Sequence, residues 1–450
     1  KNLFKNHDFL IIGKLKMNTK KILLILLTGM VLKVNAQQTK ALTLPEVLTL
    51  SKENSKQLKL SKTQIENARL QIEQAKNLRL PDLNLSGQGL HLFDTSKFKL
   101  DLPVSEAGGK TTKPDYALIG QAALSVPLFS GFRISKGITV AKYNQELQEA
   151  NYDAREQEVE IQAIEAFVNL YKTKQAQKVI IANLERAEQN VKDFENFEQN
   201  GIVARNDLLR VQLQESNVEL NLIQAQKNFN VINYNLNLLL GLPENTIIDP
   251  VLDFNYLPDG ISEEDYMYKA SENRKEYKVL ELQNKIAKKN TEIAKGDYYP
   301  QIALTGGYMY VDLHNVGSLQ NATNIGLGIK YNLASLFKNR SAVSAAKNQE
   351  QQVLDNLAIL DEQIKTQLHN AYQEYDFSIE KTHVYDKALE QANENYRIVK
   401  NKHDNGLANT DDLLTADVEQ LQAALNQAYG NADVLLAYYK LLRQAGLISQ

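Results

Sequence analysis

The chain has 450 residues with 51 Lys and Arg, 54 Asp and Glu, and no Cys. The absence of Cys excludes disulfides, thiolate metal sites, a Cys nucleophile and an acylated N-terminal Cys. The six His form no H-x-x-x-H pair, which argues against a zincin-type metalloenzyme. Since the sequence also shows no catalytic triad, paired-carboxylate cleft or cofactor motif, we expect no enzymatic activity and no cofactor.

The first 36 residues have the pattern of an export signal. Met17 is followed by Lys20 and Lys21, an apolar run from Ile22 to Leu32, and small residues that end at Ala36. A basic start, a short apolar core and a small-residue cleavage site are typical of a secretory signal peptide. We therefore expect residues 1–16 to be upstream sequence, residues 17–36 to be a signal peptide, and the rest to be exported.

Without residues 1–36 the chain keeps 44 basic and 53 acidic residues, a net charge of −9. Proteins that bind nucleic acid typically show a basic patch, and none is visible, so no nucleic-acid partner is expected. The exported part also has no apolar run of about 18 residues, the length that indicates a spanning helix. An exported chain can still enter a membrane as a β-barrel.

The most informative feature of the sequence is an internal repeat. Asn200-Gly201 and Asp207-Leu208-Leu209 recur 205 residues later as Asn405-Gly406 and Asp412-Leu413-Leu414. Before Gly87 the shift is 219 residues, so one loop is longer in the first copy. The pattern predicts a first repeat over 37–242, a linker over 243–262 in an equatorial region, and a second repeat over 263–450.

Each repeat is predicted to contain three helices and two strands, because some of its segments have apolar residues at helical spacing and others have them at every second position. In the first repeat we expect a helix at 45–79, strands at 82–93 and 116–129 with a bulge near Gly89, and helices at 131–199 and 206–240. In the second we expect a helix at 264–297, strands at 301–312 and 321–333, and helices at 334–403 and 411–446.

The two long helices carry two apolar seams each, which predicts contact with two neighbours rather than one. Their length equals that of two shorter helices laid end to end. We therefore expect 206–240 to stack with 264–297, and 411–446 with 45–79, in a layered, pseudo-cyclic tube wall.

The strands alternate apolar and polar residues and cannot bury their apolar face alone, since isolated hairpins are marginal in water. A closed barrel shared between subunits would remove the strand edges and place the apolar face against lipid. Aromatic residues gather at the predicted strand ends, where interfacial aromatics belong in such a barrel: Tyr116, Phe129, Phe132, Tyr298, Tyr299, Tyr331 and Phe337.

These features resemble the TolC-like outer-membrane efflux proteins over nearly the whole exported chain, about 44–447. The resemblance rests on the duplication, on the passage Ser125-Val126-Pro127-Leu128-Phe129-Ser130-Gly131, and on the two turns that begin at Asn200 and Asn405. It implies a mostly α fold with a small β part. Long coiled-coil hairpins would form a trimeric α-barrel, and four strands per chain would contribute to a 12-stranded transmembrane β-barrel.

The resemblance also implies a function and partners. The chain would be a passive exit duct of a tripartite efflux or type I secretion system, located in the outer membrane with a periplasmic extension. Its partners would be two further copies in a homotrimer, a periplasmic adaptor (membrane fusion) protein, an inner-membrane transporter and outer-membrane lipid.

The tips of the helical hairpins are the candidate adaptor-contacting site. Asn206 and Thr410 are expected to cap helices, and the glycines to provide a positive φ. The tip residues are Gly201, Asn206, Asp207, Leu208, Leu209, Gly406, Thr410, Asp412, Leu413 and Leu414. Asp411, Asp412 and Thr415 are the candidate periplasmic gate, since a three-fold axis would turn acids into negatively charged rings. The same acids also suit the first turn of a helix, and Asp417 could face nearby.

A different reading is a periplasmic coiled-coil adaptor or structural spacer. Such a protein would also be exported and helical, but it should contain one helical hairpin between small β-domains. The two hairpins and the alternating strands argue against it, and a need for detergent would separate the two functions.

Overall fold

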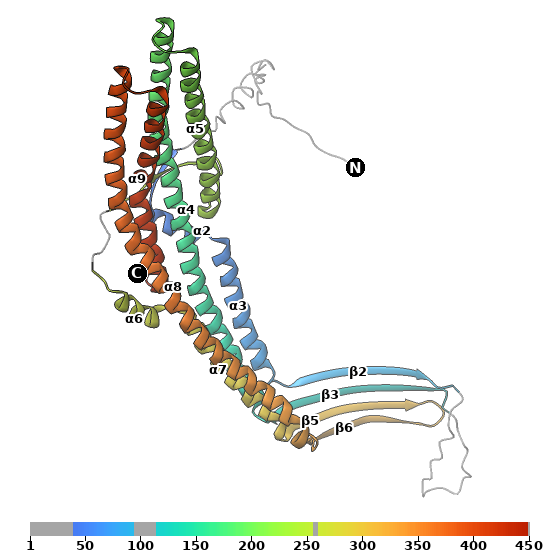
Figure 1. Ribbon diagram of the computed structural model, residues 1–450. Helices are drawn as coiled ribbons and strands as arrows, with labels where there is room; N and C mark the ends of the chain where they lie inside the picture. Colours follow the sequence, from blue (N-terminus) through green and yellow to red (C-terminus); the bar gives the residue numbers. More distant parts are fainter. Residues whose placement is uncertain (1–38, 94–113, 255–259, 449–450) are drawn as a thin grey trace, which may run out of the picture.

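The computed structural model describes residues 39–93, 114–254 and 260–448 (Figure 1). The expected upstream segment 1–16 and signal peptide 17–36 therefore lie outside the described residues. Among the helices that are described, none is both long and apolar enough to cross a membrane.

The described chain has the following order of elements: β1 (Thr39–Thr43), α2 (Leu44–Asn54), α3 (Lys56–Asn77), β2 (Asp82–His91), β3 (Tyr116–Ser130), α4 (Arg133–Gln199), α5 (Arg205–Leu240), β4 (Ile247–Val251), α6 (Glu263–Asn273), α7 (Lys275–Lys295), a 3-10 turn (Gly296–Tyr298), β5 (Gln301–Leu313), β6 (Gly317–Lys330), α8 (Ser335–Asp404) and α9 (Thr410–Gln444). The series α2, α3, β2, β3, α4, α5 thus recurs as α6, α7, β5, β6, α8, α9.

The helices form one curved wall in which long and short helices alternate (Figure 1). With 67 and 70 residues, α4 and α8 are each about 100 Å long. Towards the tips α4 packs between α5 and α9, and towards the sheet it packs between α3 and α7. This explains its two apolar seams, because each seam contacts a different neighbour.

Each predicted N-terminal helix is broken in two, and the breaks lie at equivalent positions of the repeats. The predicted helix 45–79 ends at Asn54 and resumes at Lys56, and the predicted helix 264–297 ends at Asn273 and resumes at Lys275. Ser55 and Arg274 between them both have an extended ψ of 119°. The apolar periodicity does not reveal this, since a one-residue break hardly shifts it.

The predicted stacking of short helices is wrong, because the partners come from the same repeat. The Asn54 side-chain amide donates to the Leu240 carbonyl at 2.9 Å, which joins the start of α3 to the end of α5. In the second repeat the Arg274 guanidinium donates to the Gln444 carbonyl at 3.2 Å, which joins α7 to α9. The lengths of the predicted helices could not decide which short helices stack, because pairs from the same repeat and pairs from different repeats add up to nearly the same length.

The strands form a four-stranded antiparallel sheet, in the order β2-β3-β5-β6, that extends from the end of the helical wall (Figure 1). The expected bulge near Gly89 is absent, since Gly89 pairs in register with Leu118. The register shifts instead between Pro127 and Phe129, and between Met309 and Val311. A second sheet, in which β1 and β4 run parallel, was not predicted, and β4 lies inside the segment expected to be a linker.

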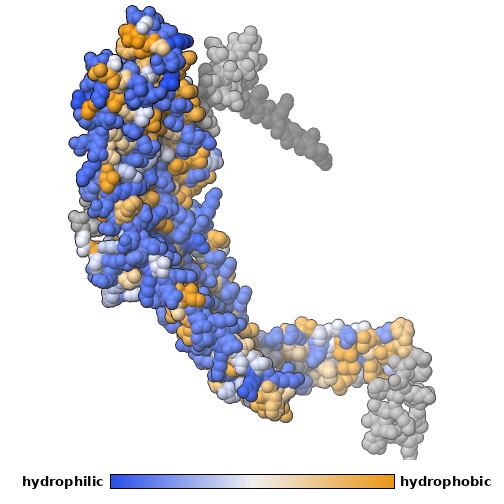
Figure 2. Space-filling model, in the orientation of Figure 1, coloured by the Kyte–Doolittle hydropathy of each residue, from blue (hydrophilic) through white to orange (hydrophobic). Residues whose placement is uncertain are grey.

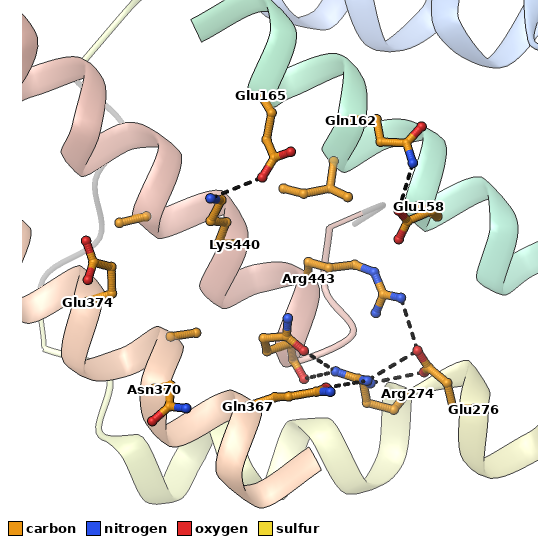
Figure 3. Close-up of a pocket in the computed structure, with 14 residues that line it drawn as sticks. Glu158, Gln162, Glu165, Arg274, Glu276, Gln367, Asn370, Glu374, Lys440 and Arg443 are labelled. Carbon is orange, nitrogen blue, oxygen red and sulfur yellow. Dashed lines mark hydrogen bonds and ion pairs between the residues drawn. The ribbon is translucent and has the colours of Figure 1, made fainter. Parts of the chain in front are cut away.

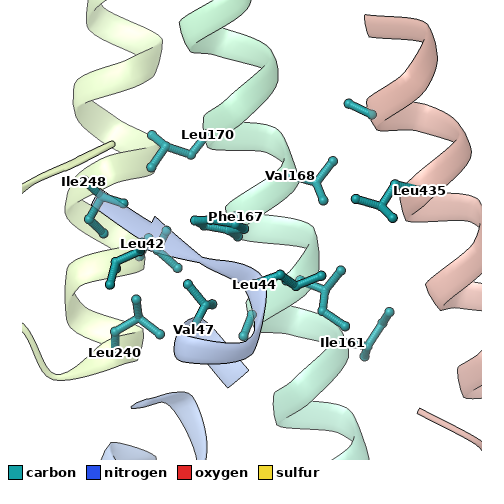
Figure 4. Close-up of a cluster of buried hydrophobic side chains, with 14 of the residues drawn as sticks. Leu42, Leu44, Val47, Ile161, Phe167, Val168, Leu170, Leu240, Ile248 and Leu435 are labelled. Carbon is teal, nitrogen blue, oxygen red and sulfur yellow. The ribbon is translucent and has the colours of Figure 1, made fainter. Parts of the chain in front are cut away.

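The main hydrophobic core lies at mid-height, where β1, α2, β4 and the end of α5 surround the middle of α4 (Figure 4). Phe167 of α4 is fully buried there between Leu42, Val47 and Ile248. The short parallel sheet therefore attaches both the N-terminal segment and the linker to the long helix.

Glycines bring the sheet and the helices together where β3 turns into α4. Gly131 has a φ of +62°, and a Cβ atom there would lie 2.2 Å from the Gly296 carbonyl oxygen. The two backbones touch, and the pair Arg133–Asp297, at 2.6 Å, braces the same junction. This contact fixes the angle between the sheet and the wall.

Candidate channel wall and helical tips

The register of the sheet gathers apolar side chains from four strands on one face. Leu83 pairs with Leu124, which pairs with Gly306 and through it with Ile325. The neighbouring rows are Leu85–Ala122–Tyr308–Thr323 and Val126–Leu304–Leu327, followed by Phe129–Ile302–Ile329. One face of the sheet is therefore apolar from edge to edge.

The opposite face of the sheet is mostly polar over its helix-side half. Its rows are Asp82–Ser125–Thr305–Gly326, Asn84–Ala123–Gly307–Asn324 and Ser86–Gln121–Met309–Ala322. This is the division expected of a strand set with lipid on one side and water on the other.

The apolar face is uncovered in the single chain, as the apolar colouring over the sheet shows (Figure 2). Leu85, Ile325 and Ile329 are 78%, 81% and 71% exposed. The sheet also leaves one edge of β2 and one edge of β6 without a strand partner within the described chain. A continuous exposed apolar face and two open strand edges indicate that further copies or lipid cover the sheet.

The two tips have the same turn geometry. At the end of α4, Ile202 N–H donates to the Phe197 carbonyl at 2.8 Å and Gly201 has a φ of +70°. At the end of α8, Leu407 N–H donates to the Lys402 carbonyl at 2.7 Å and Gly406 has a φ of +72°. These are Schellman motifs, which require a left-handed residue, so the glycines have the role that the sequence predicts.

The predicted helix caps are wrong by one or two residues. The N-cap of α9 is Asn409, whose side chain accepts from Asp412 N–H at 2.8 Å, while Thr410 is the first helical residue. The N-cap of α5 is Ala204, and Asn206 is its second helical residue. At α9 two adjacent polar residues could cap the helix and the turn geometry selects Asn409, whereas at α5 the cap position holds Ala204, which has no capping side chain.

The candidate gate acids take part in contacts within the chain. Asp412 accepts from Asn409 N–H at 3.2 Å and so completes a capping box. The Asp411 carboxylate pairs with the Arg210 guanidinium of α5 at 2.5 Å, and this exposed pair links the two hairpins. Thr415 is exposed one turn further along α9.

Several predicted tip residues form the core of the tip instead of its surface. Leu208 and Leu413 are each 2% exposed in a cluster with Val191 and Phe194, and Thr410 is also buried. They offer no surface to a partner while this packing persists. Leu209, Asn206, Asp412 and the two glycines are exposed, while Asp207 and Leu414 are half-buried.

The structure adds two exposed apolar residues that the sequence analysis did not select. Ile202 and Leu407 are 68% and 78% exposed and occupy equivalent positions directly after the two glycines. Their equivalence under the 205-residue shift was the signal that could have found them.

Asp417 does not face the gate, because it is buried between the two hairpins. Its side chain, 2% exposed, accepts from the Asn183 amide at 3.2 Å. Burial raises the pKa of Asp417, although the Arg186 charge and the Asn183 hydrogen bond oppose the shift. Asp417 therefore belongs to the packing between hairpins.

A cavity of about 600 Å³ lies at mid-height between α4, α8 and the junction of α7 with α9 (Figure 3). Arg274, with a side chain only 4% exposed, pairs with Glu276 at 3.0 Å, and Arg443 pairs with Glu276 at 3.0 Å. Lys440 pairs with Glu165 on the other side at 3.1 Å. Burial alone would raise the pKa of Glu276, but the two arginines outweigh it and lower that pKa. These contacts form an ion-pair network that stabilises the break between α6 and α7.

No group of three or more potential metal-ligating side chains occurs in the residues that the structure describes.

Comparison with known proteins gives one family and a set of similar folds. A sequence model of the family described as "Outer membrane efflux protein" matches residues 47–242 and 266–447. A comparison with curated proteins finds no significant match.

Three solved structures illustrate the fold similarity. The outer membrane protein VceC of Vibrio cholerae has a TM-score of 0.72 and 18% identity, over 90% of this chain and 96% of its own. The CmeC outer membrane channel of Campylobacter jejuni has a TM-score of 0.73 and 16% identity, over 90% and 86%. The open state of the MtrE outer membrane channel of Neisseria gonorrhoeae has a TM-score of 0.64 and 18% identity, over 90% and 89%.

Proposed function

We propose that three copies of this chain, which belongs to the outer membrane efflux protein family, assemble into a passive exit duct. The observation that carries this function is the sheet, whose register gives one apolar and one polar face between two open edges. Joining β2 of one copy to β6 of the next would close the sheet into a barrel of twelve strands. The apolar face would then meet the outer membrane and the polar face an aqueous lumen.

The helical wall supports the same assembly, because the outer helices α5 and α8 carry exposed apolar stripes. On α5 the stripe comprises Leu209, Leu213, Leu220, Ile223, Val231 and Leu238. On α8 it comprises Phe337, Ile359, Phe377, Val384 and Ile398. Since α5 packs on α4 and α8 packs on α7 and α9, these stripes lie at opposite edges of the wall. Edge-to-edge contact between copies would bury both stripes in a closed ring.

Exposed groups at the tips suit contact with a periplasmic adaptor protein, which would connect the duct to an inner-membrane transporter. Ile202, Leu209 and Leu407 offer apolar contacts, and Asn206 and Asp412 offer polar ones. No catalytic step is needed, because the transporter would supply the energy and select the cargo. A tripartite efflux pump and a type I secretion system would use the same arrangement.

Asp411, Asp412 and Thr415 remain the candidate gate. The Arg210–Asp411 pair holds the two hairpins of one chain together at the tip. We expect Arg210→Ala to loosen this contact and to raise single-channel conductance in planar bilayers. Arg397→Ala is the matched control, since among the described residues Arg397 pairs with Glu394 of its own helix. Equal conductance of Arg210→Ala and Arg397→Ala would show that the Arg210–Asp411 pair does not contribute to the gate.

The first test of the duct is the light-scattering mass of the membrane-extracted protein, with the detergent mass subtracted. We expect the mass of three chains and aggregation when detergent is removed. A monomer or dimer that stays in solution without detergent would contradict the duct and favour the adaptor or spacer function.

A paired variant tests the assembly through the α5 stripe. Leu220→Glu places a charge on the stripe, whereas Asn221→Glu places the same charge about 100° away around the helix. Leu220 is 63% exposed and Asn221 is also exposed in the single chain. We expect Leu220→Glu to weaken the trimer and Asn221→Glu to leave it intact.

A further inference from the structure

The rim of the apolar sheet face, where β3 passes into α4, combines an aromatic cluster with a pocket. Phe129 lies in the last apolar row, opposite Ile302 and Ile329, so the cluster continues the apolar face. Its ring contacts Phe132 and Tyr299 edge to face, at centroid distances of 5.2 and 6.4 Å. Aromatic residues at such a rim are typical of the boundary between hydrocarbon and water.

The pocket beside this cluster has a volume of about 270 Å³ and joins apolar walls to one cation. Leu128, Phe129, Phe132 and Ile134 provide the walls, and Arg79, which follows α3, provides the charge. Leu128 and Phe132 are 58% and 54% exposed, so the pocket opens onto the surface. It therefore offers an apolar site with a cation at its entrance.

Two neighbouring cations on the first turn of α4 pair within the chain. Arg133 pairs with Asp297 at 2.6 Å, and Lys136 pairs with Glu292 at 2.5 Å. Arg79 forms no ion pair with any described residue. Its charge is thus available for an anion from outside the chain.

The backbone holds Phe132 in an unusual position next to this charge. Phe132 has a φ of +65°, which is uncommon for a bulky side chain. It is the N-cap of α4, and its ring stays half exposed against Phe129. A strained and exposed aromatic residue at the rim suggests that the ring is held for contact with something outside the chain.

We propose that this pocket binds a phospholipid, with the headgroup phosphate at Arg79 and an acyl chain along Leu128 and the apolar sheet face. The site rests on the proposed function, since it requires that face to lie in the membrane. A guanidinium suits a phosphate because it can donate two parallel hydrogen bonds to it. In the second repeat the positions equivalent to Arg79 and Phe129 are Tyr298 and Ala334, so the second repeat lacks an equivalent site.

Native mass spectrometry of the detergent-purified protein loaded with dioleoyl-phosphatidylglycerol tests the site. The wild type should retain one lipid per chain, and Arg79→Ala should retain it roughly tenfold more weakly. Arg79→Lys should be intermediate, because an ammonium keeps the charge without the planar fork. Lys76→Ala is the matched control, since Lys76 lies on α3 and pairs with Glu73.

Two further ligands separate the phosphate from the acyl chains. Dioleoylglycerol has the same chains without the phosphate and should bind the wild type and Arg79→Ala equally weakly. Equal retention of phosphatidylglycerol by the wild type and Arg79→Ala would overturn the site. Displacement of the lipid by excess inorganic phosphate would also overturn it, because the site would then bind a free anion.

The same spectra report the mass of the assembly. If the protein is a detergent-dependent trimer but Arg79→Ala retains the lipid as well as the wild type, the result contradicts the lipid site and leaves the duct supported. A protein that needs no detergent contradicts both the duct and the lipid site.

Discussion

The two repeats break the same helix at the same place with different chemistry. In the first repeat Ser55 caps the new helix by accepting from Leu58 N–H at 3.2 Å. In the second repeat the equivalent residue is Arg274, whose buried guanidinium contacts Glu276, Gln367 and Gln444. A local hydrogen bond and a network across three helices thus produce one backbone shape.

The difference concerns how much of the fold depends on each break. Ser55 satisfies only the first turn of α3, and Asn54 makes the contact with α5. Arg274 both occupies the break and joins α7 to α8 and α9. We therefore expect changes at the second break to be larger and to depend on pH.

Removing the Arg274 side chain should have the largest effect. Arg274→Ala leaves Gln444 without its buried partner and leaves Glu276 with Arg443 alone, so it should destabilise the protein by about 3–5 kcal/mol. Chemical denaturation in detergent measures this change. Arg397→Ala, at an exposed pair within one helix, is the control and should leave the stability nearly unchanged. Equal effects of the two substitutions would show that the network contributes no stability.

Three glycines have similar positive φ angles but differ in what an added Cβ atom would meet. Comparing them therefore separates the cost of backbone strain from the cost of a steric clash at the helix breaks. At Gly406, φ +72°, a Cβ atom would meet nothing, whereas at Gly241, φ +68°, it would meet the Asn54 side chain at 2.8 Å. At Gly446, φ +74°, it would meet the backbone carbon of Asn273 at 2.7 Å.

Alanine at these glycines should therefore destabilise the protein in the order Gly446, Gly241, Gly406. The backbone strain of a positive φ is shared by all three and costs about 1–2 kcal/mol. The Asn54 side chain can move away from a Cβ atom at position 241, whereas the Asn273 backbone cannot easily move away from one at position 446. The midpoints of denaturation rank the three variants. A Gly446→Ala variant as stable as Gly406→Ala would contradict the close contact at the second break.

Removing the Ser55 hydroxyl should have a small effect. Ser55→Ala loses one helix cap and should cost about 1 kcal/mol, measured by the same denaturation. Ser55→Asn keeps a capping oxygen and should restore most of that loss. A loss as large as that of Arg274→Ala would mean that the two breaks are equally important.

The smallest effect should be the dependence on pH at the second break. The folded-state pKa of Glu276 is lowered, so its contribution is present above its unfolded-state pKa and is lost as the pH falls through the folded-state value. We expect Glu276→Gln to flatten the decline of stability in this acidic range. No change in the pH profile would argue that Glu276 titrates alike in both states.

The candidate site was predictable where it depends on local geometry. Gly201 and Gly406 could be placed because a helix end followed by a tight turn requires a positive φ. The caps were misplaced because Asn409 and Thr410 are adjacent and both can cap, and only the turn orients one of them. The pairing of Asp411 with Arg210 was also unforeseen, since 201 residues separate the two.

The sequence by itself determined the duplicated order of helices and strands and the two faces of the sheet, because periods of 3.6 and 2 residues are local properties. Only the tertiary structure decided that α5 stacks on α3 and α9 on α7, and that β1 pairs with β4. It also placed Leu208, Leu413 and Asp417 in the interior. These features depend on contacts between distant segments, and a local pattern does not specify which distant segment supplies the partner.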